Sequence, residues 1–155
     1  MKKERPRKEK ERLQQKTAGA GTRIASSPPT RRRILVIDDD LEDLLRYSAI
    51  LQHEGYEVRS IASHKEADNC ISREKFDLII VSQGTAAFEG RSILARAFER
   101  NQRVPVIVLS RSSDTDYCPE AMQMGAADCR KKPAAACEVA EIAGRHLGLS
   151  KTQAV

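Results

Sequence analysis

Ile34-Leu-Val-Ile-Asp-Asp-Asp40 joins an uninterrupted aliphatic run to three consecutive aspartates. A strand that is buried on both faces of a parallel sheet requires such a continuous apolar run. Two similar runs follow at 78–81 and 104–109, and stretches with helical spacing of apolar residues lie between them. Together with weaker strand signals at 56–61 and 128–130, this alternation predicts an α/β domain, a doubly wound sheet of the (βα)5 type.

Turn and cap residues indicate where the helices begin and end. Gly55 follows the helical pattern that starts at Leu41, which predicts a C-terminal cap there. Ser63 with Glu66 three residues later has the spacing of a capping box, so a helix is expected to open at this point.

The positive charge is concentrated at the N-terminus. Of the 27 Lys/Arg and 22 Asp/Glu in the chain, residues 1–33 hold 12 and 3, a balance of +9, which leaves −4 for residues 34–155. We expect a disordered basic tail at 1–33, a folded domain at 34–148 and a short C-terminal tail at 149–155. The basic tail is either merely solvated or an anchor for nucleic acid or an acidic partner. It has no aromatic residues to stack on bases, which makes nucleic acid the less favoured partner.

The sequence supports neither a membrane protein nor a protein with a metal centre. The longest apolar runs are too short to span a bilayer, and no apolar segment follows the basic start as in a signal peptide, so no membrane contact and a cytoplasmic location are expected. The four cysteines show no C-x-x-C spacing. They are expected to be reduced and in or near the core, with neither a zinc site nor a thiol redox motif.

Polar residues follow the predicted strands at one edge of the sheet. The first strand ends in Asp38, Asp39 and Asp40, the third in Ser82, the fourth in Ser110, and the fifth runs into Lys132. In open parallel sheets, ligands bind outside the carboxyl ends of the strands. Carboxylate and hydroxyl oxygens with an ammonium group suit Mg²⁺ and a phosphoryl group. The plainer interpretation of the aspartates is a helix N-cap, which needs only one of them.

Over about residues 33–148 the chain resembles the receiver domain of response regulators in two-component signalling. The resemblance rests on six motifs in order: Ile34–Asp40, Gly55–Val58, Phe76–Val81, Val104–Ser110, Met124–Asp128 and Lys132-Pro133. It implies a flavodoxin-like (CheY-like) fold with strand order 2-1-3-4-5. It also implies that Asp38 and Asp39 are the acidic pair around Mg²⁺, that Ser110 is the phosphate-sensing hydroxyl and that Lys132 contacts the phosphate.

Three departures from the family pattern accompany the resemblance. Ser82 stands where the family carries its phosphate-accepting aspartate. A serine hydroxyl is a poor nucleophile without an adjacent base, and it removes one anionic Mg²⁺ ligand, so any Mg²⁺ is expected to bind weakly. Cys129 replaces the fifth-strand aromatic that rotates on activation in the family. Pro119 would shorten or kink the fourth helix, unless that helix begins there.

The departures favour a pseudo-receiver: a non-enzymatic, phosphorylation-independent interaction module in phosphorelay signalling. Its partner would be a histidine kinase or a downstream signalling protein, docked on the fourth helix, fifth strand and fifth helix near Met122, Cys129 and Val139. One alternative is a working stand-alone receiver with an atypical acceptor, and another is a nucleic-acid-associated protein acting through residues 1–33. An enzyme or cofactor-binding domain is opposed by the lack of a G-x-G-x-x-G or P-loop motif.

Overall fold

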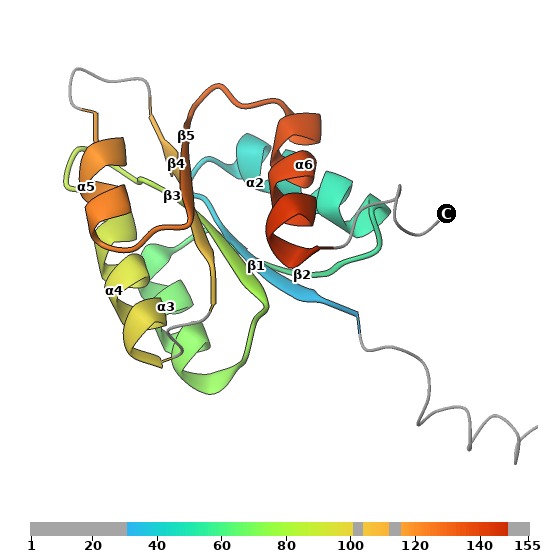
Figure 1. The fold of residues 1–155 in the computed structure, drawn as a ribbon, viewed down its shortest axis with the longest axis horizontal. Coiled ribbons are helices and arrows are strands. Elements are labelled where there is room, and N and C mark those ends of the chain that lie inside the picture. The colour runs from blue at the N-terminus through green and yellow to red at the C-terminus, as the bar shows by residue number, and fades with distance from the viewer. Residues whose placement is uncertain (1–30, 101–103, 112–115, 149–155) are drawn as a thin grey trace, which may run out of the picture. The chain divides into compact units, whose positions relative to one another are not determined.

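Five strands and five helices alternate along the described part of the chain. The computed structural model describes residues 31–100, 104–111 and 116–148. The elements are β1 (Arg33–Ile37), α2 (Leu41–His53), β2 (Glu57–Ile61), α3 (His64–Arg73), β3 (Leu78–Ser82), α4 (Gly90–Arg100), β4 (Val106–Ser110), α5 (Cys118–Gln123), β5 (Asp128–Lys131) and α6 (Ala136–Leu147). All strand pairs are parallel and the order is β2-β1-β3-β4-β5 (Figure 1). The predicted flavodoxin-like fold and strand order are confirmed.

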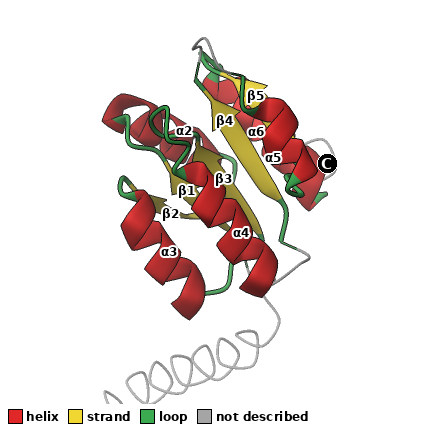
Figure 2. Ribbon diagram, turned by 90° about the vertical axis from the view of Figure 1, so that its left-hand side faces the viewer, coloured by secondary structure: helices red, strands yellow, loops and turns green. Residues whose placement is uncertain are grey.

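The sheet separates two apolar layers because successive strand residues point to opposite faces. In β1, Leu35 and Ile37 join the layer that also contains apolar residues of α3, α4 and α5. Ile34 and Val36 join the layer that contains apolar residues of α2 and α6. Figure 2 shows helices on both faces of the sheet. All four side chains are fully buried, which explains why the first strand is a continuous aliphatic run.

Two of the expected helix starts are built as the sequence indicates. Asp40 is the N-cap of α2, where its side chain accepts hydrogen bonds from the backbone N–H groups of Glu42 and Asp43. The N-cap interpretation therefore holds for one aspartate of the three. Ser63 is the N-cap of α3 and its side chain accepts from the backbone N–H of Glu66.

Pro119 begins a helix instead of interrupting one. Helix α5 starts at Cys118 with the proline in its first turn, where the missing N–H costs no intrahelical hydrogen bond. This is the exception that the sequence allowed for. The helix has only six residues, and its N-cap residue, Tyr117, makes no side-chain capping bond.

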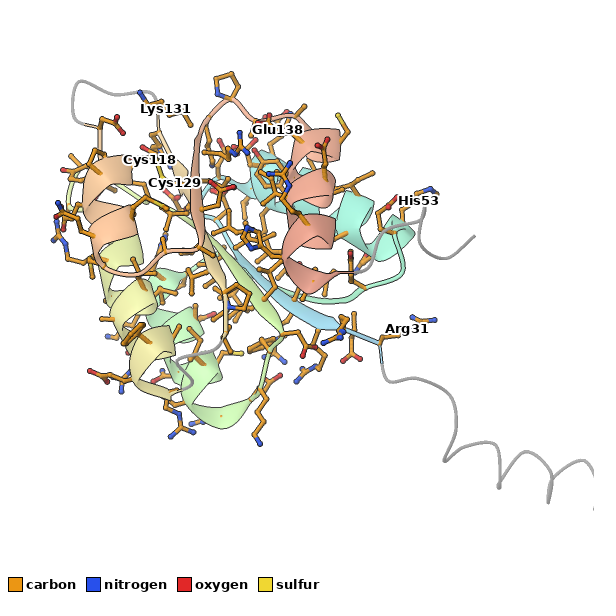
Figure 3. The ribbon with its side chains drawn as sticks, in the orientation of Figure 1. Arg31, His53, Cys118, Cys129, Lys131 and Glu138 are labelled. Carbon is orange, nitrogen blue, oxygen red and sulfur yellow. A yellow bond between two sulfur atoms is a disulfide. The ribbon has the colours of Figure 1, made fainter. Side chains whose placement is uncertain are left out.

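The expectation that all four cysteines are reduced is wrong for two of them. Cys118 and Cys129 form a disulfide (Figure 3). The fold brings the start of α5 beside β5, with the two Cα atoms 5.6 Å apart, inside the usual range for such a bond. Cys70 and Cys137 are free; Cys70 is buried, whereas Cys137 is exposed.

Some expectations concern parts of the chain that the structure does not describe. Residues 1–30 of the predicted basic tail lie outside the described residues. The predicted tail boundary is wrong at Arg33, because this residue begins β1 and forms ion pairs with Glu57 and Glu74. The C-terminal tail at 149–155 lies outside them as well. Within the described residues, no helix is both long enough and apolar enough to cross a membrane.

Candidate functional site

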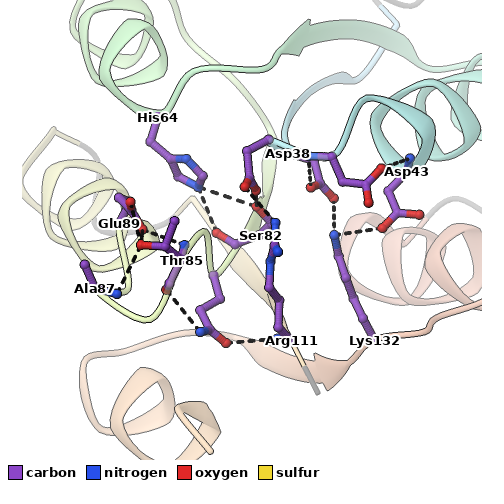
Figure 4. Close-up of polar contacts among 12 residues, drawn as sticks. Asp38, Asp43, His64, Ser82, Thr85, Ala87, Glu89, Arg111 and Lys132 are labelled. Carbon is purple, nitrogen blue, oxygen red and sulfur yellow. Dashed lines mark hydrogen bonds and ion pairs between the residues drawn. The ribbon is translucent and has the colours of Figure 1, made fainter. Parts of the chain in front are cut away.

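The polar residues predicted at the strand ends do meet at one edge of the sheet. Asp38 directly follows β1, Ser82 and Ser110 end β3 and β4, and Lys132 directly follows β5. Asp38, Ser82 and Ser110 are fully buried. Because the strands are parallel, their carboxyl ends lie at one edge, where Figure 4 shows Asp38, Ser82 and Lys132 close together. Ser110 joins them through its hydrogen bond to Gln83, the residue after Ser82.

Lys132 is held between two carboxylates. Its Nζ lies 2.6 Å from Oδ2 of Asp38 and 2.9 Å from Oδ2 of Asp43. The lysine side chain is 10% exposed and the Asp38 side chain 1%. Burial acts to lower the pKa of Lys132, but the two carboxylates outweigh it and raise this pKa above its ordinary value. Burial raises the pKa of Asp38, although the lysine opposes that shift. Lys132, Asp38 and Asp43 therefore form one ion-paired group.

Asp39 is paired with a cation that the sequence analysis did not consider. The Nη2 of Arg111 lies 2.6 Å from Oδ2 of Asp39. Burial acts to raise the pKa of Asp39, but the attraction of the guanidinium outweighs it and holds this pKa below its ordinary value. Arg111 follows directly after β4, so it reaches the carboxylate from the neighbouring part of the same sheet edge.

Ser82 has two polar side chains as neighbours, Asp39 and His64. Its Oγ donates a hydrogen bond to Oδ1 of Asp39 at 3.2 Å. The Nε2 of His64 lies 3.0 Å from the Ser82 carbonyl oxygen and 3.5 Å from its Oγ. A carbonyl oxygen only accepts hydrogen bonds, so the shorter contact requires Nε2 to carry the proton. In that state the imidazole cannot accept the hydroxyl proton through Nε2. Asp39 accepts the hydroxyl hydrogen bond through Oδ1, but its ion pair with Arg111 lowers its pKa and makes it a weaker base.

Ser110 faces a glutamine side chain. Its Oγ donates to Oε1 of Gln83 at 3.2 Å, and the backbone N–H of Arg111 donates to the same oxygen at 2.9 Å. Gln83 is itself buried and follows directly after Ser82. The loop then returns to the strand end, where Gly90 donates its backbone N–H to the carbonyl of Gln83 at 3.1 Å.

The donor set in this cluster does not fit a magnesium site. The carboxylates of Asp38 and Asp39 each already neutralise a cationic side chain, and Ser82 offers a neutral hydroxyl oxygen, a weaker ligand for a hard cation than an anionic carboxylate. Within the ranges that the structure describes, no group of three or more His, Cys, Asp and Glu side chains is arranged to hold a metal ion. Cys129 lies apart from the cluster, since it pairs with Val108 in the middle of β4.

Four members of the cluster were missed by the sequence analysis: Asp43, His64, Gln83 and Arg111. Gln83 and Arg111 carried a usable signal, because each directly follows a strand whose last residue, Ser82 or Ser110, was already assigned to the site. Asp43 lies in the first turn of α2, and His64 in the first turn of α3. Acidic and polar residues are common in first turns, so neither position indicates where its side chain points.

Comparisons with known proteins identify the family. Residues 34–143 match the response regulator receiver domain family. The chain is 32% identical over 101 residues to the alginate biosynthesis transcriptional regulatory protein AlgB of Pseudomonas syringae pv. tomato, covering 65% of this chain and 22% of the relative. It is 30% identical over 100 residues to the transcriptional regulatory protein ZraR of Escherichia coli, covering 64% and 23%. The chain thus spans about a quarter of the length of these curated relatives.

A solved structure agrees with the sequence matches. The CheY-like response regulator receiver domain protein of Methanospirillum hungatei superposes with a TM-score of 0.71 at 25% identity, covering 80% of this chain and 99% of that one. The chain therefore belongs to the response regulator receiver domain family. Receiver domains are signalling modules of two-component systems; they typically bind Mg²⁺ at the phosphorylation site and interact with histidine kinases and effector domains.

Proposed function

We propose that this receiver domain works as a phosphorylation-independent interaction module. One observation carries the proposal: Ser82 ends β3 at the position that resembles the family's acceptor, and the charged groups around it are already paired with one another. The charges at this edge of the sheet are therefore paired in one arrangement without a phosphoryl group.

The chemistry of Ser82 supports the loss of phosphoryl acceptance. A serine hydroxyl needs a base within hydrogen-bond reach to attack phosphorus. The nearest imidazole nitrogen, Nε2 of His64, is engaged as a donor to the Ser82 carbonyl, and the nearest carboxylate, Asp39, is ion-paired with Arg111. The imidazole cannot take the hydroxyl proton in this state, and Asp39, which accepts the hydroxyl hydrogen bond through Oδ1, is a weakened base because Arg111 lowers its pKa.

The cations of the cluster take the place that a metal and a phosphoryl group would fill. Arg111 neutralises Asp39, and Lys132 neutralises Asp38 and Asp43. A divalent cation or a phosphate would have to break these short ion pairs before binding. We therefore infer that Mg²⁺ binds weakly at best, and that the family roles assigned to Ser110 and Lys132 by resemblance are vestigial here.

The partner surface is proposed on α5, β5 and α6. Met122 on α5 is 47% exposed and offers an apolar contact, and Cys129 is half-buried on β5. Val139 is only 2% exposed, so it belongs to the core and is removed from the proposed contact. A histidine kinase or a downstream signalling protein remains the proposed partner class.

Incubation with acetyl phosphate and Mg²⁺, followed by intact mass spectrometry, tests the proposal. The wild-type protein should gain no phosphoryl mass, whereas Ser82→Asp, the matched variant, restores the missing carboxylate and is expected to bind Mg²⁺ more tightly. A phosphoryl adduct on the wild-type protein that maps to Ser82 or to a neighbouring aspartate would refute the proposal. It would instead favour a working receiver with an atypical acceptor.

A further inference from the structure

The Cys118–Cys129 disulfide joins two elements that are otherwise weakly held. Helix α5 has six residues, far fewer than an isolated helix needs to be stable in water. Strand β5 is an edge strand that pairs only with β4, and its residues are half-buried or exposed. The bond encloses the whole of α5 and the turn that follows it in a single covalent loop.

Among the described residues, few polar or aromatic contacts hold α5 in place besides the apolar packing of Ala121, Tyr117 and Met124. Ala121 is its one buried residue. At the start of the helix, the ring of Tyr117 lies 4.8 Å from that of Phe88, and its hydroxyl donates to the carbonyl of Ala86. Glu120 pairs with Arg91 at 2.6 Å, but both side chains are at least 40% exposed. Exposed ion pairs of this kind contribute little to stability. The position of α5 therefore depends strongly on the disulfide.

Both sulfur-bearing residues are partly accessible to solvent. Cys118 and Cys129 are each of intermediate exposure, so neither residue is fully enclosed by the core. The other two cysteines differ from this pair. Cys70 is buried, and burial raises the pKa of its thiol, which disfavours the reactive thiolate. Cys137 is exposed and unpaired.

We propose that Cys118 and Cys129 form a reversible redox-modification site whose reaction partners are dithiol reductants and small-molecule disulfides, and that its opening loosens α5 from β5. In reduction, a thiolate of the dithiol attacks one sulfur of the pair and forms a mixed disulfide. The second thiol of the reductant then resolves it, leaving both cysteines as thiols and the reductant as a disulfide. Reoxidation by a small-molecule disulfide returns two electrons and two protons to that molecule as two thiols.

Opening of the disulfide changes the protein surface beside β4 and β5, at one edge of the sheet. In the disulfide state, the Cys118–Cys129 bond holds α5 beside β5 (Figure 3). The helix then presents the exposed side chains of Met122 and Glu120 in a fixed position. In the dithiol state, the helix is free to open locally while the two apolar layers of the sheet stay intact. This control requires no phosphoryl chemistry, so it stands whether or not the proposed phosphorylation independence is correct.

The first test is equilibration of the full chain, carrying Cys137→Ser to prevent intermolecular pairing, in buffers that contain varied ratios of reduced and oxidised glutathione. Denaturing alkylation and intact mass then count the free thiols. We expect one labelled thiol, Cys70, under oxidising conditions and three under reducing conditions, with full reversal between them. If three thiols are labelled at every ratio, or one thiol persists even in excess dithiothreitol, the proposed site is wrong.

The second test is hydrogen exchange of the two redox states. The amides of Ala121 and Met124, which donate within α5, should exchange about tenfold faster or more in the dithiol state. The amide of Ile79, in the central strand β3, should be unchanged. Cys118→Ser with Cys129→Ser should reproduce the dithiol pattern in every buffer, and Cys70→Ser should behave as the parent. Equal exchange of α5 in both states would overturn the coupling.

Discussion

Replacement of Lys132 by methionine is the perturbation for which the structure gives the largest expected effect. The lysine is the shared cation of Asp38 and Asp43, at 2.6 and 2.9 Å, and the three side chains are between 1% and 16% exposed. Removing one partner of a buried ion pair costs about 3–5 kcal/mol because the remaining charge stays desolvated. Two carboxylates are left here, so we expect Lys132→Met to lower the free energy of unfolding by about 3 kcal/mol or more.

The size of this loss should depend on pH. The pKa of Asp38 is already raised by burial, and the variant loses the lysine that opposes this shift. A carboxyl group whose pKa is raised in the folded state is protonated more readily there than in the unfolded chain, so folding gains stability as the pH falls through that pKa. The difference between wild type and Lys132→Met should therefore shrink as the pH is lowered from neutral to about pH 5.

Urea denaturation followed by far-ultraviolet circular dichroism measures both effects. Lys131→Met is the matched control, because the side chain of Lys131 is 63% exposed and, among the described residues, forms its ion pair with the exposed Asp116. That variant should lose less than about 1 kcal/mol. Adding Asp38→Asn to Lys132→Met should recover part of the loss, since one unpaired charge is removed. Equal stability of the Lys131 and Lys132 variants at neutral pH would refute the reasoning.

Three further predictions concern other parts of the molecule. Arg111→Gln should raise the pKa of Asp39, which can be measured by carboxyl-carbon NMR, and an unchanged titration would contradict the ion pair. In the wild-type protein, the stability that this aspartate contributes is present above the ordinary carboxyl pKa and is lost as the pH falls through the lowered pKa. Gly90→Ala should cost about 1–3 kcal/mol in urea denaturation, because its Cβ would lie 2.8 Å from the carbonyl oxygen of Ser82; an unchanged midpoint would disprove the crowding. Deletion of residues 1–30 should leave the thermal midpoint nearly unchanged, and a drop of more than a few degrees would show that the basic segment supports the domain.

The fold was predictable because its inner strands are buried on both faces. The residues of β1 from Ile34 to Ile37 have no exposed surface, and such strands must be continuous apolar runs that stand out in a sequence. The strand boundaries were less certain. The run from Val104 to Leu109 predicted a strand, but β4 begins at Val106. Pro105 has no N–H to give to a ladder, and it contributes only its carbonyl, which accepts from Ile79.

The candidate site was predictable only in its backbone positions. Parallel topology places the residues after each strand at one edge, so Asp38, Ser82 and Lys132 were expected to converge. The direction of a side chain is not given by strand order. Two contacts of the site, His64 with Ser82 and Arg111 with Asp39, depend on side-chain rotamers and loop conformations. Neither of these produces a periodic pattern in the sequence.

The cysteines illustrate the same limit. Cys118 and Cys129 are separated by 11 positions and belong to different elements, so their spacing matches no metal or redox motif. Their pairing depends on where α5 begins, and that start was left open between a kinked helix and one that begins at Pro119. Only the three-dimensional course of the chain brings the two residues together.

The two outer strands have a consequence for self-association. An edge strand exposes unpaired backbone groups that can recruit a strand from another molecule. Here β2 carries the exposed residues Glu57 and Arg59, and β5 carries Arg130 and the exposed Lys131. Charged side chains at both borders oppose the stacking of further strands. The apolar segments of β1, β3 and β4, which would readily form intermolecular sheets if freed, are thereby enclosed between charged borders as long as the domain stays folded.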